Sequence, residues 1–282
     1  MCDQDHFDDD LKKYSRRDFS AIAAAGVGAA MLLPRAADAV EVSDRDVTIE
    51  TPDGHCDAYF VTPQTGSHPA VLIWPDIFGL RPAFRQMAKR LAESGYSVLV
   101  VNPFYRIQKA PTASKGANTP IADVRPLARS LDAATHQTDA KAFIAWLDKQ
   151  PQVDKNKKVG TTGYCMGGPI VMRTAAAVAE RVGAGASFHG GGLVTDKPDS
   201  PHLLVPQMKA SFLIAIAEND DERDPEAKTT LKEAFADSKL PAEIEVYPAG
   251  HGWCPPDSRV HNEEQAEKAW QRMLVLFSKT LV

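Results

Sequence analysis

The stretch Gly163-Tyr164-Cys165-Met166-Gly167-Gly168 decides the fold, because it joins a predicted strand to a predicted helix. Small residues two positions before and two positions after Cys165 allow the tight turn that lifts a nucleophile above the edge of a sheet. The start of the following helix offers the Met166 N–H to a developing oxyanion and favours a thiolate at Cys165. We therefore predict a cysteine nucleophile at the end of a strand.

Short apolar runs and helix-length segments alternate on both sides of this stretch. The predicted strands are Val47 to Glu50, Cys56 to Thr62, Ala70 to Trp74, Ser97 to Val101, Lys158 to Thr161, Gly185 to Phe188, Phe212 to Ile216 and Ile244 to Tyr247. The predicted helices are Ala83 to Ser94, Thr135 to Lys149, Met166 to Ala179, Glu226 to Ser238 and Glu263 to Thr280. This alternation favours a mostly parallel sheet covered on both faces, with its chemistry at the carboxyl ends of the strands. The Pro52-Asp53-Gly54 turn predicts an antiparallel hairpin at one edge. The proline-rich segment Ile107 to Leu127 is expected to be irregular, either a loop near the site or a surface excursion.

A nucleophile needs a base, and His251 follows the last predicted strand on a glycine-rich turn, Pro248 to Trp253. An acid that orients this histidine should lie between the two in the chain. Asp220 stands four residues beyond the strand that ends at Ile216, and we predict that it is this acid. The alternatives are its neighbours Glu218, Asp221 and Asp224, or a solvated acidic loop.

Together these features resemble the dienelactone hydrolase family, from about Val47 to Leu281. The landmarks are P-D-G-x-x-D-A-Y-F at Pro52 to Phe60, D-I-F-G-L at Asp76 to Leu80, R-L-A-E-S-G-Y at Arg90 to Tyr96, N-P-F-Y-R at Asn102 to Arg106, G-Y-C-M-G-G, and A-G-H-G-W followed by A-E-K-A-W. The resemblance implies the α/β-hydrolase fold. It also implies a triad of Cys165, Asp220 and His251 that hydrolyses enol lactones or activated esters through a thioester, without a metal or an organic cofactor.

The loop Pro75 to Gly79 matters because the family uses it at the active site. The resemblance implies that the Ile77 N–H is an oxyanion donor together with that of Met166. It also implies a carboxylate beside the resting thiol, usually a Glu, and this chain has Asp76 there. Since Asp is one methylene shorter, we expect its carboxylate to lie farther from Cys165. A turn or capping role is the alternative interpretation of Asp76.

The dienelactone substrate of the family carries a carboxylate, so we expect a cation in the site. The candidates near the expected mouth are Arg81, Arg85 and Arg106, with ordinary surface arginines as the alternative interpretation. His189, on a glycine-rich turn after a central strand, and Trp253, beside His251, are further candidates for the pocket wall. A hydrogen-bonded structural role is the alternative for His189.

Residues 1–39 differ in character from the remainder of the chain. S-R-R-D-F at Ser15 to Phe19 precedes an uncharged apolar run, Ala21 to Leu33, that is too short to span a bilayer, and Ala37-Asp38-Ala39 follows. This order predicts a twin-arginine-type signal peptide cleaved after Ala39, and hence export by the twin-arginine machinery to the periplasm or beyond. Residues 40–282 are then expected to form one hydrolase domain. The alternative is a core helix preceded by a basic turn.

Composition and charge limit the remaining choices. The chain has 282 residues, of which 44% are hydrophobic, and this is enough for one sizeable core. A net charge of −5 provides no broad basic surface, so a small-molecule substrate and not nucleic acid is the expected partner, and a monomer is the default. A noncatalytic relative that binds a small periplasmic ligand is the alternative function. Cys56 and Cys254 could form a disulfide or remain buried free thiols.

Overall fold

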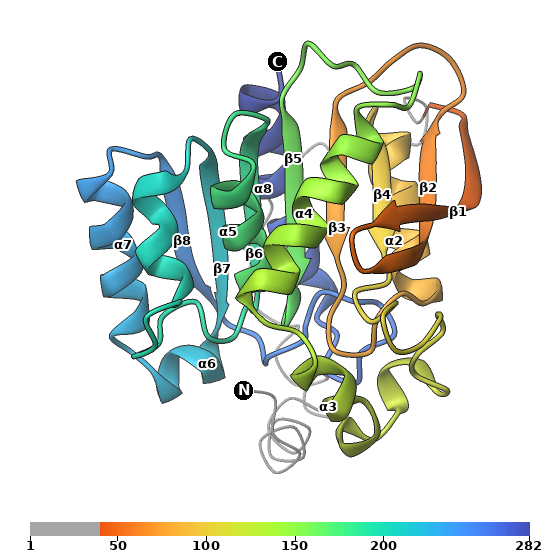
Figure 1. The fold of residues 1–282 in the computed structure, drawn as a ribbon. Coiled ribbons are helices and arrows are strands. Elements are labelled where there is room, and N and C mark those ends of the chain that lie inside the picture. The colour runs from red at the N-terminus through yellow and green to blue at the C-terminus, as the bar shows by residue number, and fades with distance from the viewer. Residues whose placement is uncertain (1–39) are drawn as a thin grey trace, which may run out of the picture.

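An eight-stranded sheet runs through residues 40–282, the part of the chain that this computed structural model describes (Figure 1). The predicted signal peptide lies outside the described residues. The strands are β1 (Val42–Thr51), β2 (Gly54–Pro63), β3 (Ala70–Trp74), β4 (Ser97–Val101), β5 (Val159–Tyr164), β6 (Val182–Phe188), β7 (Ser211–Ala217) and β8 (Ala242–Tyr247). Their order is β1-β2-β4-β3-β5-β6-β7-β8, with β1 and β2 antiparallel and the strands from β4 onward parallel. The predicted mostly parallel sheet with an antiparallel edge hairpin is confirmed.

Helices cover both faces of this sheet. They are α2 (Pro82–Glu93), α3 (Ile121–Arg129), α4 (Ala133–Leu147), α5 (Gly167–Ala177), α6 (Glu218–Arg223), α7 (Ala227–Asp237) and α8 (Glu263–Thr280), with short 3-10 helices at Gly116–Asn118 and Pro201–Gln207. One core lies between the sheet and α4, α5 and α7, where Phe143, Ile170 and Phe235 are buried. The other lies beneath α2 and α8, where Phe84 and Phe277 are buried. The strands β3 and β4 are buried at every position and rich in β-branched residues, which fits this two-sided covering.

The segment expected to be irregular, Ile107 to Leu127, contains most of a helix, α3, so that expectation was wrong in part. Pro126 lies inside α3 and removes one main-chain hydrogen bond, which is why the sequence argued against a helix. The apolar side chains Ile121, Val124 and Leu127 fall on one face of α3 and are buried, and this burial offsets the loss. A separate small apolar cluster joins α3 to the loop after β3. It consists of Ile77, Phe78, Ala113, Ala117, Ile121 and Val124.

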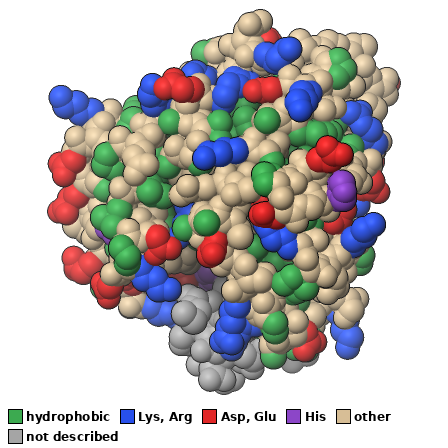
Figure 2. Space-filling model, viewed as in Figure 1, with side chains coloured by type: hydrophobic (Ala, Val, Ile, Leu, Met, Phe, Trp, Pro, Cys, Tyr) green, Lys and Arg blue, Asp and Glu red, His purple; other side chains and the backbone are tan. Residues whose placement is uncertain are grey.

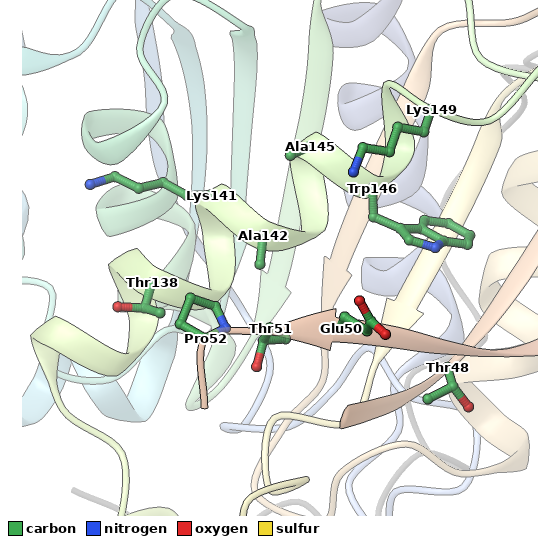
Figure 3. Close-up of a pocket in the computed structure, with 10 residues that line it drawn as sticks. All are labelled: Thr48, Glu50, Thr51, Pro52, Thr138, Lys141, Ala142, Ala145, Trp146 and Lys149. Atoms are coloured by element: carbon green, nitrogen blue, oxygen red, sulfur yellow. The ribbon is translucent and has the colours of Figure 1, made fainter. Parts of the chain in front are cut away.

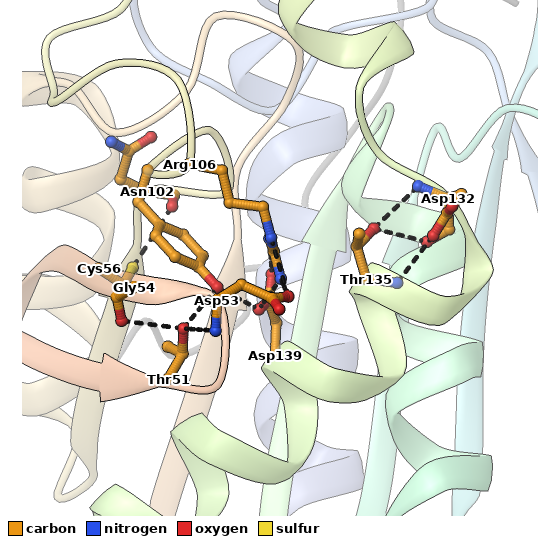
Figure 4. Close-up of polar contacts among 10 residues, drawn as sticks. Thr51, Asp53, Gly54, Cys56, Asn102, Arg106, Asp132, Thr135 and Asp139 are labelled. Atoms are coloured by element: carbon orange, nitrogen blue, oxygen red, sulfur yellow. Dashed lines mark hydrogen bonds and ion pairs between the residues drawn. The ribbon is translucent and has the colours of Figure 1, made fainter.

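The loop that follows β4 is tied to the β1–β2 turn and to α4 by a polar cluster (Figure 4). The Arg106 guanidinium donates to Asp53 at 2.5 Å and to both oxygens of Asp139, at 2.7 and 2.8 Å. The Tyr105 hydroxyl donates to Asp139 at 2.8 Å. Burial raises the pKa of Asp139, and Arg106 and Tyr105 act against that rise. Arg106 is therefore an internal anchor of the loop from which α3 continues.

The cysteines Cys56 and Cys254 do not pair with each other. Both thiols are free and buried, and they belong to the two different cores. The Cys56 thiol donates to the carbonyl oxygen of Asn102 at 3.4 Å, and burial raises the pKa of both thiols above the ordinary value. The sheet between them separates the two residues, so they are small core side chains.

The surface carries charges of both signs. On the face that Figure 2 shows, Lys and Arg side chains are interspersed with Asp and Glu side chains over the whole view. Such mixed charge does not make the extended basic stripe that nucleic-acid binding uses. Within residues 40–282, every helix is too short or too polar to cross a bilayer.

Candidate active site

The turn at Cys165 has the backbone strain of a nucleophile elbow. Cys165 follows β5, has a φ of +51° and is 6% exposed. A Cβ atom on Gly163 would lie 2.2 Å from the carbonyl oxygen of Gly167, and one on Gly167 would lie 2.3 Å from that of Trp74. Only glycine fits at these two positions, because main-chain atoms approach too closely for any side chain. The packing thus forces Cys165 to project at the carboxyl end of the sheet, immediately before α5.

His251 and Asp220 meet beside this turn. The Oδ2 atom of Asp220 lies 2.6 Å from Nδ1 of His251, and the Oδ1 atom of Asn219 accepts from the His251 main-chain N–H at 2.8 Å. Asp220 is on α6, the short helix that begins directly after β7. Its neighbour Asp221 is held by Lys228 at 2.7 Å. Of the acids that the sequence left open, the structure brings Asp220 to His251.

Two main-chain N–H groups near Cys165 lack an acceptor. Ile77 and Met166 both line the cavity that contains Cys165, and neither N–H donates to an acceptor within residues 40–282. A free N–H at the start of a helix, opposed by one from the loop after an early strand, is the arrangement that stabilises an oxyanion. The structure leaves both N–H groups without an acceptor in the described residues, and their role as oxyanion donors stays a prediction.

The carboxylate of Asp76 is paired with the guanidinium of Arg81. Its Oδ1 and Oδ2 atoms accept from the Arg81 guanidinium at 2.7 and 2.9 Å, and Oδ1 also accepts from the Phe78 N–H at 2.9 Å. Burial raises the pKa of Asp76 while Arg81 lowers it, and the fork-shaped contact with both oxygens is the one an ionised carboxylate makes. We therefore treat the two as an ion pair. Asp76 has the turn-capping contact that was its alternative interpretation, and Arg81 is 2% exposed and lies behind the cavity wall.

His189 is buried next to His251. Its φ is +40°, it is 0% exposed, and its ring centroid lies 5.3 Å from that of His251 and 4.9 Å from that of Trp253. Neither ring nitrogen has a hydrogen-bond partner in residues 40–282. Burial, and then the charge of His251, lower the pKa of His189 well below 6.5, so its imidazole is neutral. His189 lines the cavity, whereas Trp253 lies beneath it and stacks on Tyr247.

The cavity has a volume of about 800 Å³ and takes its wall from most of the loops at this end of the sheet. Apolar side chains from α3, the turn that follows it and the loop after β6 form much of it, including Ile121, Leu131 and Leu193. Its cations are Arg125, Arg129, Arg223 and Lys228.

None of the three arginines predicted to bind the substrate lines the cavity that residues 40–282 form. Arg81 and Arg106 are held in ion clusters, and Arg85 pairs with Asp46 at 2.6 Å. Arg125 and Arg129 were missed because they belong to α3, a helix that was not predicted and that begins in the segment expected to be irregular. Their spacing of four residues, one turn apart on a helix, was the available signal.

A second cavity of similar volume, about 810 Å³, lies between β1 and α4 (Figure 3). Its wall holds Lys141, Lys149, Glu50 and Trp146 but no cysteine or histidine. The groove contains none of the predicted catalytic residues, so we take the first cavity as the candidate active site.

Known proteins resemble this chain over most of its length. The model of the dienelactone hydrolase family matches residues 56–281. A Synechocystis sp. protein whose name refers to carboxymethylenebutenolidase is 30% identical over 249 residues, which cover 86% of this chain and 99% of that protein. Carboxymethylenebutenolidase 1 of Cupriavidus pinatubonensis is 28% identical over 243 residues, which cover 86% of this chain and 96% of that enzyme.

Solved structures share the fold. The crystal structure of P91, a dienelactone hydrolase-like promiscuous phosphotriesterase from metagenomic libraries, superposes with a TM-score of 0.71 at 22% identity. The match covers 86% of this chain and 99% of that one. At this level of identity the likeness speaks for the α/β-hydrolase architecture alone.

Proposed function

Because this chain belongs to the dienelactone hydrolase family and is a hydrolase of lactones or esters, we propose that it acts through a Cys165-His251-Asp220 triad and a thioester intermediate. The observation that carries the proposal is the 2.6 Å contact between His251 and Asp220 beside a cysteine on a strained, glycine-flanked turn. A nucleophile, a base and an acid that orients the base are the parts that acyl transfer requires.

In the acylation step, His251 takes the proton of the Cys165 thiol, and the sulfur attacks the carbonyl carbon of the substrate. The carbonyl oxygen becomes an oxyanion between the N–H groups of Ile77 and Met166. When the tetrahedral intermediate collapses, the bond from carbon to the leaving oxygen breaks, and His251 gives its proton to that oxygen. Asp220 stabilises the imidazolium while the proton is on His251. The products are a thioester and an alcohol or enol.

In the second step, His251 removes a proton from water, and the hydroxide attacks the thioester carbonyl. The C–S bond breaks, and the thiolate recovers the proton from His251, which restores the enzyme. A thiolate is a good nucleophile but also a good leaving group, so activated esters and enol lactones suit this chemistry better than amides.

The walls of the cavity support an apolar acyl or lactone substrate that carries an anionic group. The volume of about 800 Å³ lies toward the upper end of the range typical of small-molecule sites. Arg129 on α3 supplies positive charge to the wall, whereas Lys228 on α7, which also lines it, is held by Asp221. A substrate carboxylate would be attracted to this charge while its carbonyl carbon faces Cys165.

The test is hydrolysis of p-nitrophenyl acetate, p-nitrophenyl butyrate and a dienelactone by residues 40–282 and by Cys165→Ala. We expect Cys165→Ala to abolish hydrolysis, with a thioester adduct of Cys165 detectable by mass spectrometry in the unmodified protein at early times. Activity that survives the substitution would refute the cysteine mechanism. No activity on all three esters, together with alkylation of Cys165 at pH 6 to 7 no faster than a model thiol, would favour the ligand-binding alternative.

Export is a further part of this proposal. It is supported by the paired Arg16 and Arg17, the apolar run and the Ala37-Asp38-Ala39 site in the sequence. Fractionation of cells that produce the full chain, compared with a variant carrying Arg16→Lys and Arg17→Lys, tests it. Retention of the variant in the cytoplasm with export of the unmodified chain is the expected result, and equal distribution of both would overturn export by this route.

A further inference from the structure

A buried ion cluster joins three loops beside the catalytic cavity. Arg81 donates through Nη1 and Nη2 to the two oxygens of Asp76, at 2.7 and 2.9 Å, and through Nε and Nη2 to the two oxygens of Asp257, at 2.8 and 3.0 Å. Asp257 also accepts from the Ala117 N–H at 3.3 Å. One guanidinium thus connects the loop after β3, the 3-10 helix Gly116–Asn118 and the loop that continues from His251.

We propose that Arg81 is a positioning residue for the reaction: its two-sided clamp on Asp76 and Asp257 holds the Ile77 N–H in place opposite the catalytic histidine loop. This inference rests on the proposed function, because it assigns to Ile77 an oxyanion to stabilise. Ile77 is the residue that directly follows Asp76, so any shift of the clamped carboxylate moves that N–H.

The burial of the cluster supports a positioning role, because buried side chains hold one arrangement whereas those of a solvent-exposed ion pair are mobile. The Arg81 side chain is 1% exposed and that of Asp76 is 9% exposed. The Asp257 side chain, at the outer end of the cluster, is 34% exposed. The guanidinium also lies 4.8 Å from the ring centroid of Phe84 and 5.6 Å from that of Phe78. Burial alone would lower the pKa of Arg81, but the two carboxylates raise it above its ordinary value. A planar fork with both edges occupied has one orientation, which lysine cannot reproduce.

The clamp also separates Asp76 from the chemistry at sulfur. Both of its oxygens accept from Arg81, so the carboxylate is committed to the guanidinium and not to accepting a proton from Cys165. In this chain the thiol proton is therefore left to His251. Asp76 depends on Arg81 for its charge partner, because without Arg81 it would be a buried carboxylate with no cation.

The experiment compares ester hydrolysis by Arg81→Gln, Arg81→Lys and a matched control, Arg85→Gln. Arg85 lies one helical turn further along, and its side chain is 36% exposed against Asp46. A displaced oxyanion donor slows the chemical step without weakening substrate binding, so we expect kcat for Arg81→Gln to fall by about 100-fold with KM little changed. The kcat of Arg81→Lys should be about tenfold higher than that of Arg81→Gln and still below that of the wild type, because lysine keeps the charge but not the fork-shaped contact. Arg85→Gln should retain wild-type kcat.

Two further measurements separate positioning from general damage to the fold. Added guanidinium ion should raise kcat of Arg81→Ala and leave the wild type and Arg85→Gln unaffected. Asp257→Asn, a change at the more exposed end, should fold and lower kcat while Cys165 is alkylated by iodoacetamide at the wild-type rate, since alkylation needs no oxyanion donor. If Arg81→Gln does not fold, Asp257→Asn and the guanidinium response decide the matter.

The clamp is overturned if folded Arg81→Gln keeps wild-type kcat, or if Asp257→Asn slows alkylation as much as ester hydrolysis. Its failure is distinguishable from failure of the proposed function. If Cys165→Ala is inactive and Arg81→Gln is unimpaired, the positioning role of Arg81 is refuted and the triad stands. If Cys165→Ala is active, the triad itself is refuted.

Discussion

Asp220→Asn is the substitution that tests the catalytic geometry most directly. The carboxylate of Asp220 accepts from Nδ1–H of His251 at 2.6 Å, which leaves Nε2 without a proton and able to accept one. An asparagine can place its amide N–H against Nδ1, and the histidine then carries its proton on Nε2. In that tautomer His251 cannot deprotonate Cys165.

The size of the effect follows from the charges. Two unit charges 2.6 Å apart attract by roughly 6 kcal/mol at an effective dielectric constant of about 20. The side chains of His251 and Asp220 are 17% and 20% exposed, so solvent screens part of this attraction, and about 4 kcal/mol is a reasonable share in the transition state. Since each 1.36 kcal/mol is a factor of ten, kcat for Asp220→Asn should fall by about 1,000-fold.

The assay is hydrolysis of p-nitrophenyl acetate under saturating conditions, with Asp221→Asn as the matched control. Asp221 neighbours Asp220 on the same helix and carries the same charge, but it pairs with Lys228 instead of the histidine. Asp221→Asn should stay near wild-type kcat. An Asp220→Asn enzyme that is folded and only a few times slower than the wild type would refute the proposed role of Asp220, as would an equal loss in both variants.

The remaining predictions concern stability. Gly163→Ala should destabilise the fold by about 3 kcal/mol or more and lower Tm, because its Cβ would meet a rigid main-chain carbonyl at 2.2 Å; an unchanged Tm would contradict this packing. Arg106→Met should cost about 3 to 5 kcal/mol in urea unfolding, because Asp139, whose side chain is 2% exposed, would lose its cation; a change below about 1 kcal/mol would show that the anchor is dispensable. Burial lowers the pKa of His136 from 6.5 to about 3, so the unfolded chain binds a proton between these values that the folded chain does not, and stability falls as pH drops from about 6.5 toward 3. His136→Gln should therefore lose roughly 2 kcal/mol less than the wild type between pH 7 and pH 5, and parallel losses would place the titration elsewhere.

The sequence by itself determined the succession of the strands and of helices α2, α4, α5, α7 and α8, but not α3 or α6. It also determined the glycine-flanked turn at Cys165 and the residue types of the candidate triad. These features are local. Glycines around a nucleophile, β-branched runs and the spacing of apolar residues act through the backbone of a few neighbouring residues, so they can be seen without a partner from elsewhere in the chain. The same is true of the hairpin turn at Pro52 to Gly54.

Only the tertiary structure decided which charges face the cavity. The sequence favoured Asp220 but left Asp221 open, because both follow β7 and the choice depends on where the loop after β8 places His251. The sequence offered Arg81 as a substrate-binding residue and did not single out Arg129, which lines the cavity. The burial of Arg81 between Asp76 and Asp257, the latter 176 positions away in the chain, is a long-range contact that leaves no trace in local spacing. A charged side chain has the same identity in a cavity wall and in an ion cluster, and its role is set by the partners that folding brings to it.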